Sequence, residues 1–234
     1  NAFIARLRQT LSQTETFIAE AAHHIRTPLA TLRSEAEMAL RQAGDEPTRA
    51  RLRGMIRATE ESARSANQLL DHATVLFRAD QRALDRVDLG AMVAALAERF
   101  APTADLKDME IALALPEAPL ETVGDAVLIE AALRNLIDNA LKYSPAETRV
   151  DIALVAEDGF ARLDVADRGR GLGGETQAAL SQRFRRGGNV GGVVGSGLGL
   201  TIVSETVGAM GGRFSLSERK EGGTCATLWL PLSG

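Results

Sequence analysis

The chain has 234 residues, of which 45% are hydrophobic and 25% are charged, and its formal net charge is −4 at pH 7. These values are typical of a soluble globular protein with one or two domains. No run of like charge stands out, so the basic surface of a nucleic-acid-binding protein is not expected. Cys225 is the only cysteine, which excludes an intrachain disulfide and a cysteine-based zinc site. No stretch approaches the roughly 20 apolar residues of a membrane helix.

The first third of the chain has the pattern of two long helices. Apolar or small residues recur at alternating steps of three and four from Ile4 to Leu32 and again from Leu52 to Phe77, which is a heptad repeat. Gly44–Pro47, between the two repeats, has the residue types of a turn. Two helices with narrow apolar seams cannot enclose a core alone. The pattern therefore predicts an α hairpin that forms a dimeric four-helix bundle.

The heptad repeat stops at about residues 82–88, and the remainder has the pattern of an α/β domain. Helices are expected at Leu89–Phe100, Ala126–Tyr143 and Gly197–Met210. Strands are expected at residues 110–115, 149–156, 160–167, 213–218 and 225–230. The glycine-rich segment 187–199 is expected to be a mobile loop. We place the domain boundary between residues 86 and 87, which gives domains of residues 1–86 and 87–234.

Two adjacent histidines, His23 and His24, lie in the first expected helix. The heptad seam passes beside His23 and leaves it on the outer face, with Thr27 one turn further along. An exposed histidine on a helix is most often only solvated. Pro28 weakens that interpretation, because a proline in a helix interior costs about 3 kcal/mol and so requires a reason. The pattern therefore points to surface chemistry near His23.

A polar face on the expected helix 126–143 is the first of four segments that suit a nucleotide. Asn135, Asn139 and Lys142 follow one another at helical spacing. Two amides and an ammonium group suit a polyphosphate bound to Mg²⁺, a cation that prefers oxygen ligands and takes few of them from protein. An ordinary polar helix face is the alternative.

The other three segments contain glycines or arginines. Asp167 could accept a hydrogen bond from an exocyclic amino group such as adenine N6, and Gly169 and Gly171 would let the backbone approach a ligand closely. By itself that motif is also a common turn. The segment Gly195-Ser196-Gly197-Leu198-Gly199 opens a helix, where backbone N–H groups bind phosphate. Gln182–Arg186 adds cations that could reach phosphates. A P-loop is excluded, because its motif occurs nowhere in the chain.

Together these motifs resemble those of the sensor histidine kinases. The segment His23-His24-Ile25-Arg26-Thr27-Pro28-Leu29 is similar to the H-box of that family, and the later segments are similar to its N, G1, F and G2 boxes, in the family's order. The resemblance extends from about Phe17 to Leu232. It implies a dimerisation and phosphotransfer hairpin followed by an α/β sandwich with the Bergerat ATP-binding fold.

The resemblance also implies roles for individual residues. His23 would be the phosphoacceptor, Thr27 would orient a hydrolytic water in a phosphatase reaction, and Asn139 would bind Mg²⁺. Asp167 would read adenine. The remaining positions implied to contact ATP are Asn135, Lys142, Tyr143, Gly169, Gly171, Arg183, Arg186, Gly195, Gly197, Leu198 and Gly199.

The implied cofactors are ATP and Mg²⁺, and the implied partners are a second copy of the chain and a response regulator with an acceptor aspartate. We interpret the chain as a fragment, because it begins at Asn1 and not at Met. Family resemblance then suggests the cytoplasmic portion of a bacterial sensor that is anchored in the inner membrane only through residues upstream of Asn1. Phosphatase activity beside the kinase activity is expected.

Two departures from the family pattern affect the mechanism. His24 stands where an acidic residue is usual, and Ser181 replaces the first aromatic residue of the F-box. We hypothesise that His24 acts as the base, which would make autophosphorylation fall steeply below about pH 6.5. The alternative is that the position is merely tolerated.

Two other classes of function stay open. A related ATPase or an anti-sigma-type serine kinase would share the ATP pocket, but the H-box and the hairpin argue against both. A dominant phosphatase or a non-catalytic dimeric relay, with ATP only as a conformational ligand, is kept open by the unusual His24.

Overall fold

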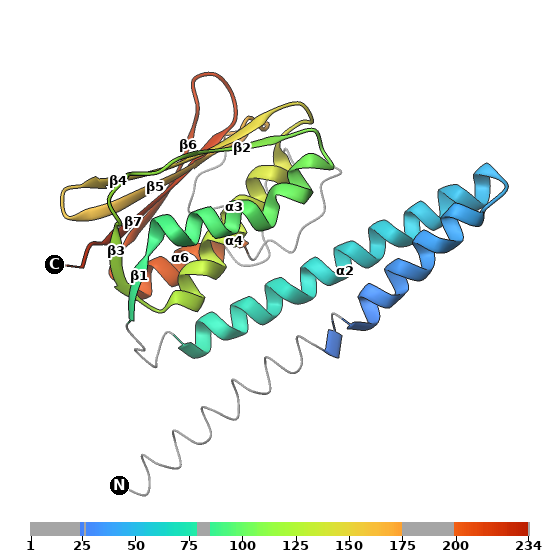
Figure 1. The fold of residues 1–234 in the computed structure, drawn as a ribbon, viewed down its shortest axis with the longest axis horizontal. Coiled ribbons are helices and arrows are strands. Elements are labelled where there is room, and N and C mark those ends of the chain that lie inside the picture. Colours follow the sequence, from blue (N-terminus) through green and yellow to red (C-terminus); the bar gives the residue numbers. More distant parts are fainter. Residues whose placement is uncertain (1–23, 26, 79–84, 175–198, 234) are drawn as a thin grey trace, which may run out of the picture. The chain divides into compact units, whose positions relative to one another are not determined.

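The computed structural model describes residues 24–25, 27–78, 85–174 and 199–233. Internal contacts divide the chain into two compact units, Asn1–Phe77 and Arg78–Gly234, which are a helical hairpin and an α/β domain (Figure 1). The expected boundary between residues 86 and 87 stays a prediction.

The hairpin consists of residues 27–42, which are helical, and helix α2, Glu46–Arg78. Asp45 caps α2, since its Oδ1 accepts a hydrogen bond from the Thr48 N–H at 2.8 Å. Pro47 falls in the first turn of α2, where a helix does not need the backbone N–H that proline lacks. The predicted hairpin with a turn near residues 44–47 is confirmed.

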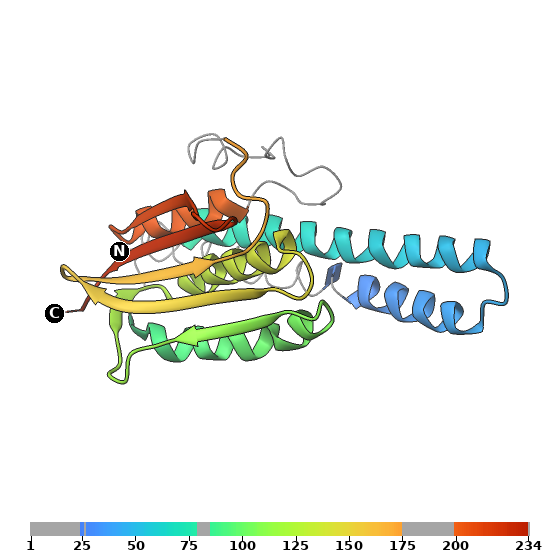
Figure 2. The same ribbon diagram turned by 90° about the horizontal axis from the view of Figure 1, so that it is seen from above.

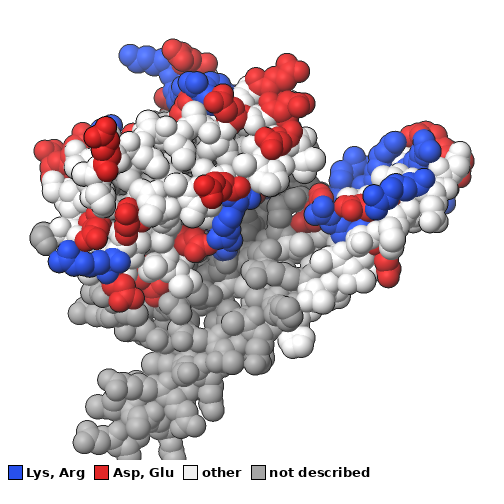
Figure 3. Space-filling view, viewed as in Figure 1, with Lys and Arg blue, Asp and Glu red and all other residues white. Residues whose placement is uncertain are grey.

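The described part of the hairpin leaves much of its apolar surface uncovered. Leu32, Met38 and Met55 are 52%, 50% and 56% exposed, and the described seam residues of α2, such as Ile56, are only half-buried. Figure 3 shows charged side chains along one flank of the hairpin and uncharged ones along the other. An amphipathic hairpin with so little buried apolar surface requires a further partner, as the predicted dimeric bundle would provide.

The α/β domain is built on a five-stranded sheet with the order β2-β4-β5-β7-β6. β2 runs parallel to β4, and the other neighbouring pairs are antiparallel. The strands are β2 Glu110–Ala114, β4 Arg149–Glu157, β5 Phe160–Ala166, β6 Arg213–Glu218 and β7 Thr224–Pro231. Helices α3 Leu89–Asp105, α4 Ala126–Tyr143 and α6 Gly199–Ala209 lie on one face of this sheet (Figure 2). This is the expected α/β sandwich.

The alternation of buried and less buried residues along the strands decides which face of the sheet carries the core. Val150, Ile152 and Leu154 of β4 are buried towards the helices and belong to the same hydrophobic core as Leu133 and Ile137 of α4. The intervening residues of β4 and β5 point to the open face, which carries polar side chains. This open face becomes important for the site, because Asp151 lies on it.

Two strands were not expected from the sequence. β1, Asp85–Asp88, and β3, Glu121–Gly124, pair antiparallel as a separate two-stranded sheet. They are short, and Val87 and Val123 are their only large apolar residues, so no alternating apolar pattern marks them. Long-range contacts stabilise them instead, for example the Thr122 hydroxyl donating to the Pro231 carbonyl at 2.7 Å. Helix α3 also continues beyond the expected end at Phe100 and includes Pro102.

Candidate functional site

Helix α4 is held in place at its N-terminus by the pair Gly124-Asp125. The Asp125 Oδ1 accepts hydrogen bonds from the N–H groups of Val127 and Leu128, at 2.8 and 3.3 Å. A Cβ on Gly124 would lie 2.7 Å from the Met210 Sδ and 3.1 Å from the Ile129 Cδ1, so the glycine lets this end of α4 pack closely against the segment after α6. The cap and the close packing fix the helix that carries the first group of candidate residues.

Asn135 and Asn139 lie on the same side of α4, but their surroundings differ. Asn135 is buried, and its Nδ2 donates to the Ala131 carbonyl at 2.8 Å. Asn139 is half-buried, and its side-chain amide has no hydrogen-bond partner among the described residues. A Cβ on Gly199 would lie 3.1 Å from the Asn135 Oδ1 and 3.4 Å from the Asn139 Nδ2. The first turn of α6 therefore packs directly on the polar face of α4.

The C-terminal end of α4 meets the segment that follows β5. A Cβ on Gly169 would lie 2.7 Å from the Tyr143 carbonyl oxygen, so a side chain there would collide with backbone. The Ser144 Oγ accepts a hydrogen bond from the Arg168 N–H at 3.3 Å. Lys142 places its Nζ 5.2 Å from the centre of the Tyr143 ring. Two of the segments singled out in the sequence are thus in direct contact.

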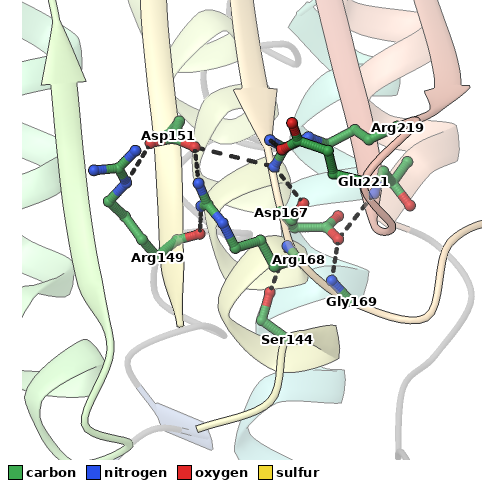
Figure 4. A network of polar contacts seen from close by, with 9 residues as sticks. Ser144, Arg149, Asp151, Asp167, Arg168, Gly169, Arg219 and Glu221 are labelled. Carbon is green, nitrogen blue, oxygen red and sulfur yellow. Dashed lines mark hydrogen bonds and ion pairs between the residues drawn. The ribbon is translucent and has the colours of Figure 1, made fainter. Parts of the chain in front are cut away.

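Asp167, the first residue after β5, is fixed by the start of β7 (Figure 4). Its N–H donates to the Thr224 carbonyl at 2.8 Å, and its Oδ1 accepts from the N–H groups of Gly169 and Thr224 at 2.7 and 3.0 Å. The Oδ2 has no hydrogen-bond partner in the described part of the chain. Burial raises the pKa of the Asp167 carboxyl, an effect opposed by the two N–H donors and by the charge of Arg219. The result is one oriented carboxylate oxygen that can accept a hydrogen bond from a ligand.

The second glycine after Asp167 in the segment 167–171 is required for a different reason. Gly171 has a φ of +71°, in the region that favours glycine, and a Cβ there would lie 3.3 Å from the Glu218 Oε1. The same oxygen accepts from the Leu172 N–H at 3.0 Å. The segment 167–172 is therefore held by α4 on one side and by the end of β6 on the other.

Comparison with known proteins assigns each of the two units to a protein family. Residues 13–82 match the profile described as "His Kinase A (phospho-acceptor) domain", and residues 124–234 match "Histidine kinase-, DNA gyrase B-, and HSP90-like ATPase". Together the two matches cover most of the chain, in the order that the motifs indicated. The chain belongs to the sensor histidine kinases.

Curated histidine kinases align over nearly the whole chain. Sensor protein kinase PmrB of Pseudomonas aeruginosa is 34% identical over 236 residues, which is 99% of this chain and 48% of that protein. The histidine-protein kinase/phosphatase MprB of Mycolicibacterium vanbaalenii is 30% identical over 232 residues, or 96% of this chain and 47% of that protein. The chain thus spans about half the length of the curated relatives that it matches.

A solved structure supports the two-unit architecture of this histidine kinase. Full-length ShkA in complex with AMPPNP has a TM-score of 0.65 and 26% sequence identity, and the match covers 93% of this chain and 46% of that one. Because the match covers 93% of the chain, it includes residues of both the hairpin and the ATP-binding domain.

The structure describes only part of the residues that the sequence singled out in this kinase. His24 and Thr27 are exposed on helical residues of the hairpin. The ATP-binding domain brings together α4, the segment 167–171 and Gly199. The remaining candidates lie outside the described residues: His23, Arg183, Arg186, Gly195, Gly197 and Leu198.

Sequence reasoning missed the residues that orient Asp167 in this kinase. Thr224 supplies both a carbonyl and an N–H group, and Arg219 donates from Nη1 to the Asp167 carbonyl at 2.8 Å. The glycine before the last strand, Gly223, could have indicated a close approach of backbone at this point. No local pattern marks Arg219, which lies in the turn between β6 and β7.

Gly199→Ala is expected to lower the affinity of the kinase for Mg²⁺–ATP about three- to tenfold, because the added Cβ pushes on the Asn135 and Asn139 amides. Gly208→Ala is the matched control in the same helix, since a Cβ there meets nothing within 4 Å. Isothermal titration with Mg²⁺–ATP measures both affinities. Equal affinities for the two variants would mean that the contact of α6 with α4 does not affect the nucleotide.

Proposed function

We propose that this chain transfers the γ-phosphoryl group of ATP to its own His23 and then to an aspartate of a response regulator. The observation that carries the proposal is that Gly199 packs on Asn139 and the segment carrying Asp167 packs on the end of the same helix, in a domain that follows a phosphoacceptor hairpin. In the first step a bond forms between an imidazole nitrogen and the γ-phosphorus. The bond from that phosphorus to the bridging oxygen breaks, and ADP leaves.

The residues present fit ATP and Mg²⁺. The Asp167 Oδ2 can accept from an adenine amino group, and the N-terminus of α6 can face phosphate. Asn139 offers an amide oxygen, the type of ligand that Mg²⁺ takes, and its amide has no other partner among the described residues. When bound, the metal would neutralise charge on the phosphates. Lys142, Arg183 and Arg186 are proposed to supply further positive charge.

The hairpin is proposed to act as a homodimer. Its exposed Leu32, Met38 and Met55 need cover, and the phosphoacceptor domain that residues 13–82 match supports assembly of this kind. Phosphatase activity is also proposed, because the MprB relative is a histidine-protein kinase/phosphatase. Thr27 would then orient the water, as the resemblance of its segment to the H-box implies. Attachment to a membrane through further residues of a longer protein is likewise a proposal. Among the described residues, no helix is long and apolar enough to cross a membrane.

Incubating the chain with Mg²⁺ and γ-labelled ATP tests the proposal. We expect label that is stable to base and labile to acid, present in the wild type and absent from His23→Gln, because only His23 would accept the phosphoryl group. His24→Gln is the matched control one residue away. It should keep the acceptor but react more slowly if His24 is the base.

Each other outcome is informative. Label lost only in His24→Gln would move the acceptor by one residue. A wild type that binds ATP but carries no label would contradict the kinase proposal and favour the phosphatase or relay, which acts on a phosphorylated regulator without autokinase activity. Label on serine would favour the anti-sigma type of kinase.

A further inference from the structure

Three guanidinium groups converge on one carboxylate, Asp151, on the open face of the sheet (Figure 4). The Arg149 Nε lies 2.6 Å from the Asp151 Oδ1, and the Arg168 Nη2 lies 2.8 Å from its Oδ2. The Arg219 Nη1 lies 4.0 Å from the same Oδ2. The three arginines come from β4, from the segment after β5 and from the β6–β7 turn. Asp151 is therefore the point where three segments far apart in the sequence are held together.

Two of these arginines determine where Asp167 lies. Arg168 is the next residue in the chain; its N–H donates to the Ser144 hydroxyl, and its guanidinium also donates to the Arg149 carbonyl. Arg219 reaches the Asp167 carbonyl with the same Nη1 that faces Asp151. Asp151 is thus linked to Asp167 through an arginine on each side.

These contacts leave Asp167 little freedom. Its backbone N–H and carbonyl are both bonded, and its Oδ1 already accepts two N–H groups. The orientation of the Oδ2 then depends on whether the β6–β7 turn stays beside the segment after β5. Asp151 and Arg219 are 30% and 20% exposed at their side chains, so water screens their attraction less than it does for fully exposed pairs. Without Asp151, the cations of Arg168 and Arg219 would lose the anion that lies between them.

We propose that Asp151 is a positioning residue for base recognition, which holds Arg168 and Arg219 so that Asp167 prefers adenine to guanine. Adenine carries an amino group, a donor, at the position where guanine carries a carbonyl oxygen, an acceptor. A fixed carboxylate oxygen attracts the first and repels the second, whereas a loosened one discriminates less. The proposal rests on the proposed function of Asp167 as the residue that reads the base.

Asp151→Asn tests the proposal in the full chain, with the dissociation constants of Mg²⁺–ATP and Mg²⁺–GTP measured by isothermal titration. We expect the affinity for ATP to fall about two- to tenfold. The ratio of the affinity for ATP to the affinity for GTP should fall by a similar factor. Asp164→Asn is the matched control, since Asp164 lies on the same face and also pairs with an arginine, Arg162, at 3.2 Å. Among the described residues Asp164 contacts Arg162 and Thr227, and neither of them contacts Asp167, so the Asp164→Asn variant should keep both dissociation constants.

A second variant separates positioning from folding. Arg219→Gln should also reduce the ratio of ATP affinity to GTP affinity. The double variant should lose less than the sum of the two single losses, because Arg219 is one of the two arginines through which Asp151 acts. The fluorescence of Trp229, the only tryptophan, follows unfolding of this domain. Equal losses for ATP and GTP, or an unchanged ratio, would overturn the proposal and leave Asp151 a structural residue.

The Asp167→Asn variant distinguishes a failure of the role proposed for Asp151 from a failure of the role proposed for Asp167. If Asp167→Asn removes the preference for ATP and Asp151→Asn does not, only the inference about Asp151 fails. If Asp167→Asn itself keeps the preference, the proposed role of Asp167 fails, and the inference fails with it.

Discussion

Asp167→Asn is expected to lower ATP affinity about 100-fold or more while the domain stays folded. The hydrogen bonds already made by Asp167 explain the size of the effect. The Oδ1 accepts from the Gly169 and Thr224 N–H groups, so the amide oxygen of an asparagine must occupy that place. The amide NH₂ then falls where the Oδ2 was. A donor would therefore face the donor on adenine, in place of an acceptor.

The same substitution should not reduce stability at neutral pH. Burial raises the pKa of Asp167, so folding favours its protonated form. The stability that such a carboxyl contributes is complete below its ordinary pKa and is lost as pH rises through the raised value. At pH 7 the ionised side chain therefore opposes folding, and a neutral asparagine with the same acceptor removes that effect.

Titration with Mg²⁺–ATP and unfolding followed by Trp229 fluorescence measure the two halves of this prediction. Asp164→Asn, a carboxylate-to-amide change on the same sheet, is the control for a general effect of lost charge. Unchanged ATP affinity in Asp167→Asn would show that the carboxylate does not contact the base. A large fall in unfolding temperature would show instead that the charge stabilises the segment.

The sequence predicted those elements whose burial follows a regular pattern. Val150, Ile152 and Leu154 alternate along β4, and the apolar residues of α4 recur at helical spacing, so both elements were expected nearly at their observed bounds. The polar face of α4 and the glycines after Asp167 could also be singled out from the sequence, because those residue types are unusual at those positions.

Features made by contacts distant in sequence could not be predicted in this way. β1 and β3 are strands because they pair with each other across the length of α3 and β2, and their own residues have no apolar alternation. Arg219 is 52 residues from Asp167, and only the antiparallel pairing of β5 with β7 brings its turn alongside. The burial of Asn135 likewise depends on the packing of α6 against α4.

Gly223→Ala is expected to destabilise the ATP-binding domain by about 2 kcal/mol or more, and to weaken ATP binding in the fraction that stays folded. A Cβ on Gly223 would lie 2.2 Å from the Asp167 carbonyl oxygen and 2.8 Å from the Arg168 Cα. Both atoms belong to backbone, so no side-chain rotation relieves the clash. The turn between β6 and β7 must move away, and Thr224 and Arg219 move with it.

Gly222→Ala separates this collision from backbone strain. Gly222 and Gly223 have φ values of +89° and +92°, so alanine is strained at either position, but a Cβ on Gly222 meets nothing within 4 Å. We expect Gly222→Ala to cost about 1 kcal/mol and to leave ATP affinity unchanged. Trp229 fluorescence during urea unfolding and titration with Mg²⁺–ATP compare the two variants. If both lose the same stability and neither loses affinity, the β6–β7 turn can shift without disturbing Asp167, and its contacts do not orient the carboxylate. If only Gly223→Ala loses affinity, the close packing of this turn on Asp167 is what keeps the base-reading oxygen in place.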